Sequence, residues 1–327
     1  MFEQLGLLGN TIILAGSLFV LDRASDSTIT NSVRVADIAG YGRTTTGFIL
    51  IAFCTSLSGL SVSIFSALGQ ERINVAIGNA LGSNIVNVCF ILGICLLLAA
   101  ARRVDYLKLL PSMAKEEVGS LYFGLFVASI IPLALIYIGY ASRFVGIMLL
   151  ATFAVYTLWL LRKRSVRAER LLSREKQRLN EYVFFTFLAA IGVVISSLFI
   201  VDSASYIAAN IGISPVAIGS TVVAFGTSIP VLAVSIDAVR KGHLDLVLGN
   251  IVGTCFMNTT FILGIPLIAL PLRVDLATFS SLVMFSVITS LFLWYFLSSE
   301  KTSWKEGAVL LFMYFLFLTI SLGGYRV

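Results

Sequence analysis

Two short polar segments lie within apolar runs that are each long enough to cross a bilayer. They are Gly226-Thr227-Ser228-Ile229-Pro230 and the stretch from Gly249 to Asn258. An uncompensated hydroxyl, amide or free backbone group at that depth is costly. Hydroxyl and amide oxygens, with carbonyls freed where Pro or Gly interrupts the helical ladder, can replace part of a cation's hydration shell. The pattern therefore favours a cation site within a membrane over close packing of small residues alone.

An earlier stretch of the chain repeats both polar segments. Ala52-Phe53-Cys54-Thr55-Ser56 corresponds to Ala224-Phe225-Gly226-Thr227-Ser228, and Gly78-Asn79-Ala80-Leu81-Gly82-Ser83 corresponds to Gly249-Asn250-Ile251-Val252-Gly253-Thr254. The same spacing continues to Asn87 in the first copy and Asn258 in the second. We therefore expect a duplicated unit whose polar positions match between the two copies.

The composition excludes several classes of protein. Of 327 residues, 58% are hydrophobic and 12% are charged, which is typical of a polytopic membrane protein. No segment outside the apolar runs is large enough to form a nucleic-acid-binding domain, so the net charge of +6 bears on membrane topology. No nucleophile-base pair, metal cluster or phosphate loop is found, so we expect neither an enzyme nor a bound cofactor. The expected partners are the lipid bilayer and inorganic cations, and the sequence indicates no protein partner.

The apolar runs predict an all-α membrane protein with ten transmembrane helices. The predicted spans cover approximately residues 4–21, 46–68, 76–100, 118–138, 142–161, 182–201, 213–239, 244–270, 277–298 and 305–323.

Lys and Arg predict the orientation of these spans. If the segment between the fifth and sixth spans is cytoplasmic, the outer segments contain only Arg72, Arg143, Arg273 and Arg326. The positive-inside rule then places the protein in the cell membrane with both termini outside. Each copy has an odd number of spans, so residues 1–161 form one five-helix repeat, 162–181 a basic cytoplasmic linker, and 182–327 a second, inverted repeat. Inverted repeats with interrupted helices are typical of secondary transporters.

Two segments outside the predicted spans leave alternatives open. The basic linker could be an interfacial helix held by anionic lipid, although a solvated linker is favoured. Segment 22–45 is longer than its counterpart in the second copy, and we expect an ordinary insertion there in preference to a gate or a partner contact. Acidic residues are predicted to lie outside the span interiors, where they cap helices or offset basic neighbours. The nearest of them, at predicted span ends, are Asp22, Asp202, Asp237 and Asp245.

The repeated polar segments resemble the two alpha repeats of the calcium/cation antiporter superfamily, in particular its sodium/calcium exchanger branch. The resemblance covers most of the chain and implies ten helices, with cation ligands on the second, third, seventh and eighth. Position by position, it implies ligand hydroxyls at Thr55, Ser56, Ser83, Thr227, Ser228 and Thr254, and amide ligands at Asn87 and Asn258.

The sequence departs from the family pattern at two positions. The family has a glutamate directly after the Pro of each Gly-Thr-Ser-x-Pro motif, and these glutamates take part in binding Ca²⁺ and Na⁺. Here the two positions hold Gly59, which follows Ser58 in place of Pro, and Val231. Ca²⁺ usually takes about 6 to 8 oxygens that include several carboxylates, whereas neutral oxygen dipoles can coordinate Na⁺ or another monovalent cation. Proton antiport is disfavoured because His243, the single histidine, is in a predicted cytoplasmic turn.

We therefore expect a diverged secondary-active antiporter whose neutral central site suits a monovalent cation such as Na⁺ better than Ca²⁺. Two other readings of the same residues stay open. The positive ends of interrupted helices could favour an anion or a polar neutral solute. Loss of both glutamates would also suit a transport-inactive relative that serves as a structural or regulatory membrane subunit.

Overall fold

The computed structural model describes residues 6–39, 43–57, 59–60, 73–102, 115–138, 140–162, 178–210, 224–269, 272–273, 276–298 and 303–323. These residues are almost entirely helical, and a single pair of two-residue strands is found among them. Parts of five predicted segments lie outside the described residues: 4–5 of the first span, 58 and 61–68 of the second, 213–223 of the seventh, 270 of the eighth, and 163–177 of the linker.

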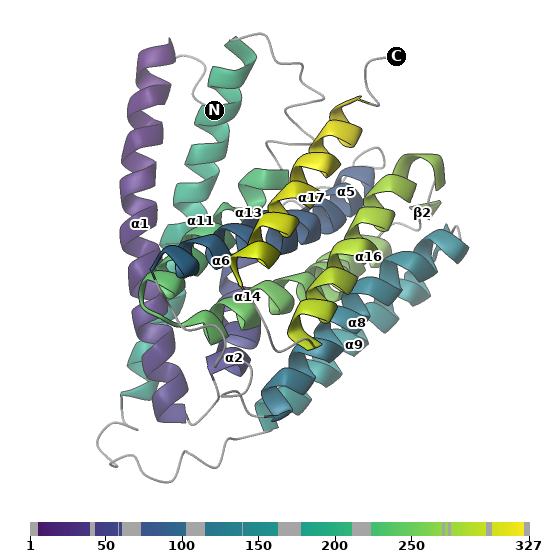
Figure 1. Ribbon diagram of the computed structural model, residues 1–327, viewed down its shortest axis with the longest axis horizontal. Helices are drawn as coiled ribbons and strands as arrows, with labels where there is room; N and C mark the ends of the chain where they lie inside the picture. The colour runs from purple at the N-terminus through teal and green to yellow at the C-terminus, as the bar shows by residue number, and fades with distance from the viewer. Residues whose placement is uncertain are drawn as a thin grey trace.

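The described residues form ten successive helical runs, which confirms the predicted all-α membrane fold of two inverted five-helix repeats (Figure 1). The first five are α1 (Gly6–Ala39); α2 (Arg43–Thr46) with η2 (Gly47–Ile51) and α3 (Ala52–Thr55); α5 (Ile73–Ile85) with η4 (Val86–Ile91) and α6 (Leu92–Ala101); α8 (Lys115–Ile138); and α9 (Arg143–Arg162). The second five are α11 (Leu179–Asn210); α13 (Ala224–Arg240); α14 (Leu244–Met257) with η8 (Asn258–Ile262) and α15 (Leu263–Ala269); α16 (Leu276–Ser298); and α17 (Trp304–Gly323).

The outer helices have the surface of a membrane protein. Among the described residues, six helices are long and apolar enough to cross a bilayer. Large apolar side chains such as Phe144, Trp159 and Phe184 are exposed on them. Such exposure would be unfavourable in water and is expected against lipid. The chain is therefore a multi-pass membrane protein.

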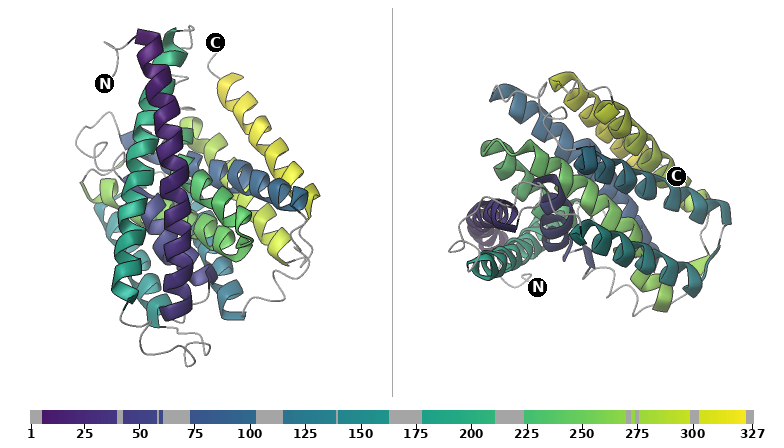
Figure 2. Two further views of the ribbon diagram at one scale, coloured as in Figure 1. Left: turned by 90° about the vertical axis from the view of Figure 1, so that its left-hand side faces the viewer. Right: turned by 90° about the horizontal axis from the view of Figure 1, so that it is seen from below.

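The two longest helices, α1 and α11, lie side by side along one flank of the molecule (Figure 2). A Cβ atom at Gly192 of α11 would lie 3.3 Å from the Cβ of Ala24 in α1, so the helices pack closely.

The structure corrects the prediction of a loop over residues 22–45, because α1 continues to Ala39. This part of the helix is not an apolar run, because small polar residues occupy its buried face. Ser25, Thr28 and Ser32 are buried together with Ile29 and Ala36, at the spacing of one helical face. Asp22 lies within α1 and Asp202 lies within α11, so neither residue is at the end of its helix.

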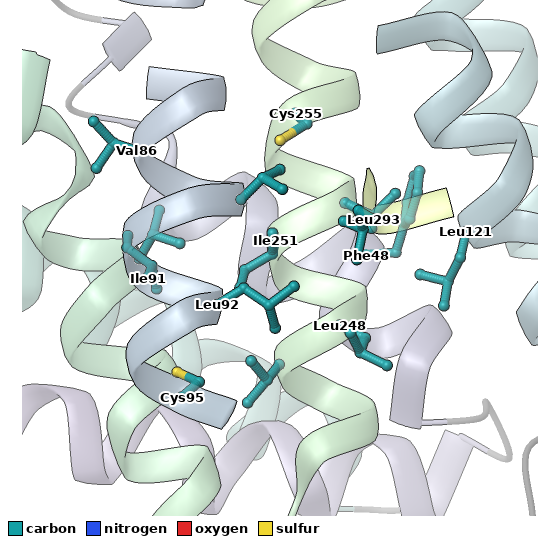
Figure 3. Packing of buried hydrophobic residues seen from close by; sticks show 14 of the residues in the cluster. Phe48, Val86, Ile91, Leu92, Cys95, Leu121, Leu248, Ile251, Cys255 and Leu293 are labelled. Carbon is teal, nitrogen blue, oxygen red and sulfur yellow. The ribbon is translucent and has the colours of Figure 1, made fainter. Parts of the chain in front are cut away.

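Helix α14 runs through the centre of the molecule, and every residue from Leu244 to Met257 is buried. Ile251 of α14 lies beside Leu92 of the neighbouring run, and Leu248 lies on the side of α14 that faces Leu121 (Figure 3). On another side of α14, glycines allow the closest contact of the fold. A Cβ atom at Gly249 would overlap the carbonyl oxygen of Thr44, and one at Gly253 would overlap that of Phe48.

Contacts at the two ends of the bundle agree with the predicted alternation of spans. Strand β1 (Tyr140–Ala141) pairs with β2 (Leu272–Arg273), and both strands lie in segments predicted on the same side. At the opposite end, Lys241 Nζ lies 2.7 Å from Asp26 Oδ1, and Arg43 Nη1 lies 3.0 Å from His243 Nδ1. These four residues belong to segments that were likewise predicted to share one side.

Candidate functional site

Four helical runs supply the side chains that the sequence predicted for a cation site. Thr55 ends α3, and Ser56 follows it. Ser83 lies in α5, and Asn87 lies one turn further on in η4. Thr227 and Ser228 lie in the first turn of α13, whereas Thr254 lies in α14 and Asn258 begins η8. All of them are buried except Thr227, which is partly buried.

Hydrogen bonds between the two repeats bring these runs together. Thr227 Oγ1 of α13 donates to Asn79 Oδ1 of α5 at 2.8 Å, and Ser83 Oγ lies 3.3 Å from Thr227 Oγ1. Thr55 Oγ1 of α3 donates to Asn250 Oδ1 of α14 at 3.2 Å.

A third link joins Asn258 and Asn84. Asn258 Nδ2 of η8 donates to Asn84 Oδ1 of α5 at 2.9 Å. Together with the bond from Asn250 Nδ2 to Ser235 Oγ of α13, at 3.3 Å, these contacts connect all four runs in one polar cluster.

Four members of this cluster, Asn79, Asn84, Ser235 and Asn250, were missing from the predicted site. Asn79 and Asn250 occupy matched positions in the duplicated segments, so the repetition could have been used to predict them as site residues. The group that each amide would meet could not be predicted from the sequence, because every one of these bonds joins different helices.

Several buried polar atoms of the site have no hydrogen-bond partner among the described residues. They include both amide atoms of Asn87, the hydroxyl oxygens of Ser56 and Thr254, and the amide nitrogen of Asn84. A buried polar atom without a partner is costly, and native proteins usually pair such atoms with a ligand or an ordered water. The oxygens of Ser56, Asn87 and Thr254 are therefore suited to bind a cation.

The site is uncharged over the part of the chain that the structure describes. No group of three or more His, Cys, Asp or Glu is placed there to hold a metal ion. Val231 is buried in the hydrophobic core. A Cβ atom at Gly59 would lie 3.3 Å from Ile262 Cδ1 and 3.8 Å from Asn79 Nδ2, so position 59 borders the cluster without contributing a carboxylate.

A buried carboxylate, Asp237, lies elsewhere on α13. It accepts a hydrogen bond from Ser25 Oγ and pairs with Arg240 Nη1 at 3.0 Å. Asp237 is ten residues beyond Thr227, which corresponds to about 15 Å along a helix. It therefore offsets a basic neighbour at the helix end, as predicted, and does not charge the site.

Matched π-helical segments flank the site. In the first repeat η4 contains Asn87, and in the second repeat η8 begins at Asn258. π-helical turns are rare and often occur at functional sites. The interruption expected at Pro230 takes a milder form, since α13 continues through Pro230 and only the helical bond that this residue would donate is missing.

The fold and the cluster define the class of protein. Two inverted five-helix repeats enclose a polar cluster built from both repeats, with irregular helical segments at matched positions. This is the arrangement of secondary transporters. The sequence model described as sodium/calcium exchanger protein matches residues 9–162 and 181–323, so the chain belongs to the sodium/calcium exchanger family.

Similar proteins occur in bacteria and archaea. The chain is 29% identical over 302 residues to the inner membrane protein YrbG of Escherichia coli K12, covering 88% of this chain and 89% of that protein. It is 28% identical over 355 residues to the sodium/calcium exchanger MaX1 of Methanosarcina acetivorans, covering 95% and 98% of the two chains.

A solved structure with the same fold is that of the sodium-calcium exchanger NCX_Mj soaked with Na⁺ and Sr²⁺. It aligns with a TM-score of 0.80 and 25% sequence identity, covering 96% of this chain and 99% of NCX_Mj. These relatives are transporters or membrane proteins by name, which agrees with the expectation that the chain is not an enzyme.

Proposed function

We propose that this protein is a secondary-active cation antiporter whose central site binds a monovalent cation such as Na⁺ in preference to Ca²⁺. The observation that carries the proposal is the buried cluster of hydroxyl and amide groups between the repeats, in which the amide oxygen of Asn87 has no hydrogen-bond partner among the residues that the structure describes. Its ligands would be Thr55, Ser56, Ser83, Asn87, Thr227, Ser228, Thr254 and Asn258, with no resident cofactor.

Charge is the reason for preferring a monovalent ion. A divalent cation that loses its water needs carboxylates to offset its charge, and the glutamate positions of the family hold Gly59 and Val231. Neutral oxygens suffice for Na⁺ or K⁺. The relatives named as sodium/calcium exchangers support antiport as the reaction class.

The proposed orientation places both termini outside the cell and the linker 162–181 in the cytoplasm. It is supported by the distribution of Lys and Arg and by the pairing of β1 with β2, which joins two segments assigned to the outer face.

A second candidate function is that of a transport-inactive structural or regulatory subunit. The hydrogen bonds between the repeats favour it, because Thr55, Ser83, Thr227 and Asn258 already bind amides or hydroxyls of the protein itself. In this candidate the bonds would serve to hold the two repeats together.

Ion flux into liposomes separates the two candidates. Reconstituted protein should show uptake that depends on Na⁺ or K⁺, and Thr227→Val should abolish it because this change removes a ligand hydroxyl while keeping the shape of the side chain. Thr186→Val is the matched control: Thr186 is buried in α11, and its hydroxyl donates to the Tyr182 carbonyl of the same helix. Absence of flux for Na⁺, K⁺, Ca²⁺ and H⁺ would support the inactive candidate instead.

A further inference from the structure

Two of the bonds between the repeats are symmetry-related. Thr55 of the first repeat binds Asn250 of the second, and Thr227 of the second repeat binds Asn79 of the first. Thr55 and Thr227 are matched positions in the duplicated segments, as are Asn79 and Asn250. Each repeat therefore supplies an amide to the ligand threonine of the other.

The Thr55 hydroxyl lies close to three hydrogen-bond acceptors. Thr55 Oγ1 lies 3.0 Å from Ile51 O, 3.3 Å from Ala52 O and 3.2 Å from Asn250 Oδ1. All three atoms can only accept a hydrogen bond, and they share the single proton of the hydroxyl, with Ile51 O as the nearest acceptor. Its two lone pairs are not used by these contacts, and lone pairs are what a cation binds.

Asn250 is itself held in place. Its side chain is buried, and its amide nitrogen donates to Ser235 Oγ of α13 at 3.3 Å. This second bond fixes the amide so that its oxygen faces Thr55.

Asn79 has the corresponding role at the other threonine. Its Oδ1 accepts from Thr227 Oγ1 at 2.8 Å and lies 3.5 Å from Ser83 Oγ. One amide oxygen thus attracts the hydroxyl protons of two proposed ligands that belong to different repeats.

We propose that Asn79 and Asn250 are positioning residues for the ion. Their amide oxygens accept from the hydroxyls of Thr227 and Thr55 and hold the two threonine oxygens in the orientation that binds a cation, and the amides do not bind the cation themselves. This inference rests on the proposed function. It adds that each ligand threonine is oriented by the opposite repeat, which makes cation affinity depend on contact between the repeats.

A double-mutant cycle on the cation concentration for half-maximal uptake tests the proposal. Asn250→Ala and Thr55→Val should each raise this concentration by roughly tenfold, as expected for loss of one buried hydrogen bond or one ligand. The double mutant should be no worse than Thr55→Val alone, because Asn250 acts through that hydroxyl. Thr55→Ser, which keeps the hydroxyl, should restore affinity close to that of the wild-type protein.

The second repeat gives an independent cycle if a variant of Asn250 fails to fold. Asn79→Ala, Thr227→Val and their combination should behave in the same way. Asn31→Ala is the control, since Asn31 lies in α1 and donates to the Ser27 carbonyl of its own helix. It should leave the half-maximal concentration unchanged.

The possible results separate this inference from the proposed function. A purely structural bond would lower the maximal rate or the melting temperature and leave the half-maximal concentration unchanged, which would overturn the inference alone. The inference would also be overturned if the affinity losses of the two single variants multiplied in the double mutant, because the amides would then act independently of the threonines. A wild-type protein without cation-dependent flux would overturn the proposed function and this inference together.

Discussion

The side chains at positions 59 and 231 determine the charge of the candidate site. Gly59 is four residues after Thr55, and Val231 is four residues after Thr227, so each lies one turn from a proposed ligand on the same helical face. The space beyond Gly59 leads to Asn79 and Ile262. A carboxylate at either position would therefore enter or border the polar cluster.

Introducing both carboxylates should create Ca²⁺ binding. We expect Gly59→Glu combined with Val231→Glu to raise Ca²⁺ affinity by at least about tenfold, or about 1.4 kcal/mol, because two negative charges offset the desolvated divalent ion. Binding of radioactive Ca²⁺ to the purified protein in detergent measures the change.

The matched control is Gly59→Gln combined with Val231→Gln, which adds nearly the same volume without charge. It should leave Ca²⁺ binding at the wild-type level. If the folded Glu variant binds Ca²⁺ no better than the Gln variant, the missing carboxylates do not set the ion preference.

The hydroxyl and amide positions could be predicted from the sequence because the duplicated motifs repeat them at a constant spacing. The partners of these groups could not. Asn79 and Asn84 are five residues apart in one motif, yet Asn79 binds Thr227 of α13 and Asn84 binds Asn258 of η8. That difference arises from how the helices cross, which the residue types do not encode locally.

Among the helices, the contact of α14 with α2 and η2 is the tightest point near the site. It depends on Gly249 and Gly253, whose missing side chains let the backbone carbonyls of Thr44 and Phe48 approach. This contact holds α14 against the run that ends in Thr55, so it sets the geometry of the Thr55–Asn250 bond.

Adding a methyl group at this contact should destabilise the fold. Gly253→Ala would force its Cβ against the Phe48 carbonyl, at a cost of about 1–3 kcal/mol typical of overpacking. We expect a lower melting temperature in detergent. Gly119→Ala in α8 is the control, because no atom lies within 4 Å of the added Cβ. Equal melting temperatures for the two variants would show that the α14 contact tolerates expansion.

Most helices could be predicted from the apolar runs, and most of their ends fall within a few residues of the observed ones, although α11 continues to Asn210, past its predicted end at 201. The exceptions have physical causes. The second half of α1 is buried through Ser25, Thr28 and Ser32, so a search for apolar residues misses it. The π-helical segments η4 and η8 arise within continuous apolar helices, and hydropathy does not distinguish them from ordinary α-helix.

For the molecule as a whole, the structure shows which segments share a side, and Lys and Arg predict which side is the cytoplasm. The strand pair β1–β2 marks one end of the bundle, and the pair Lys241–Asp26 marks the other. Basic residues are concentrated in the segments that the sequence assigns to the side of this second end. The positive-inside rule therefore predicts that the end with the strands faces outward.

Single cysteines at the two ends should report this orientation. Tyr140 in β1 and Arg162 at the end of α9 are both exposed, so Tyr140→Cys should react with a membrane-impermeant maleimide on intact cells, and Arg162→Cys should react only after permeabilisation. The native cysteines Cys54, Cys89, Cys95 and Cys255 are buried, so the unmodified protein should not be labelled and needs no cysteine removed. Labelling of Arg162→Cys on intact cells, with Tyr140→Cys protected, would mean that the whole molecule is inserted the other way. The inner and outer sides of the molecule, as assigned here, would then be exchanged, and the proposed site would open to the cytoplasm at the end that carries the strands.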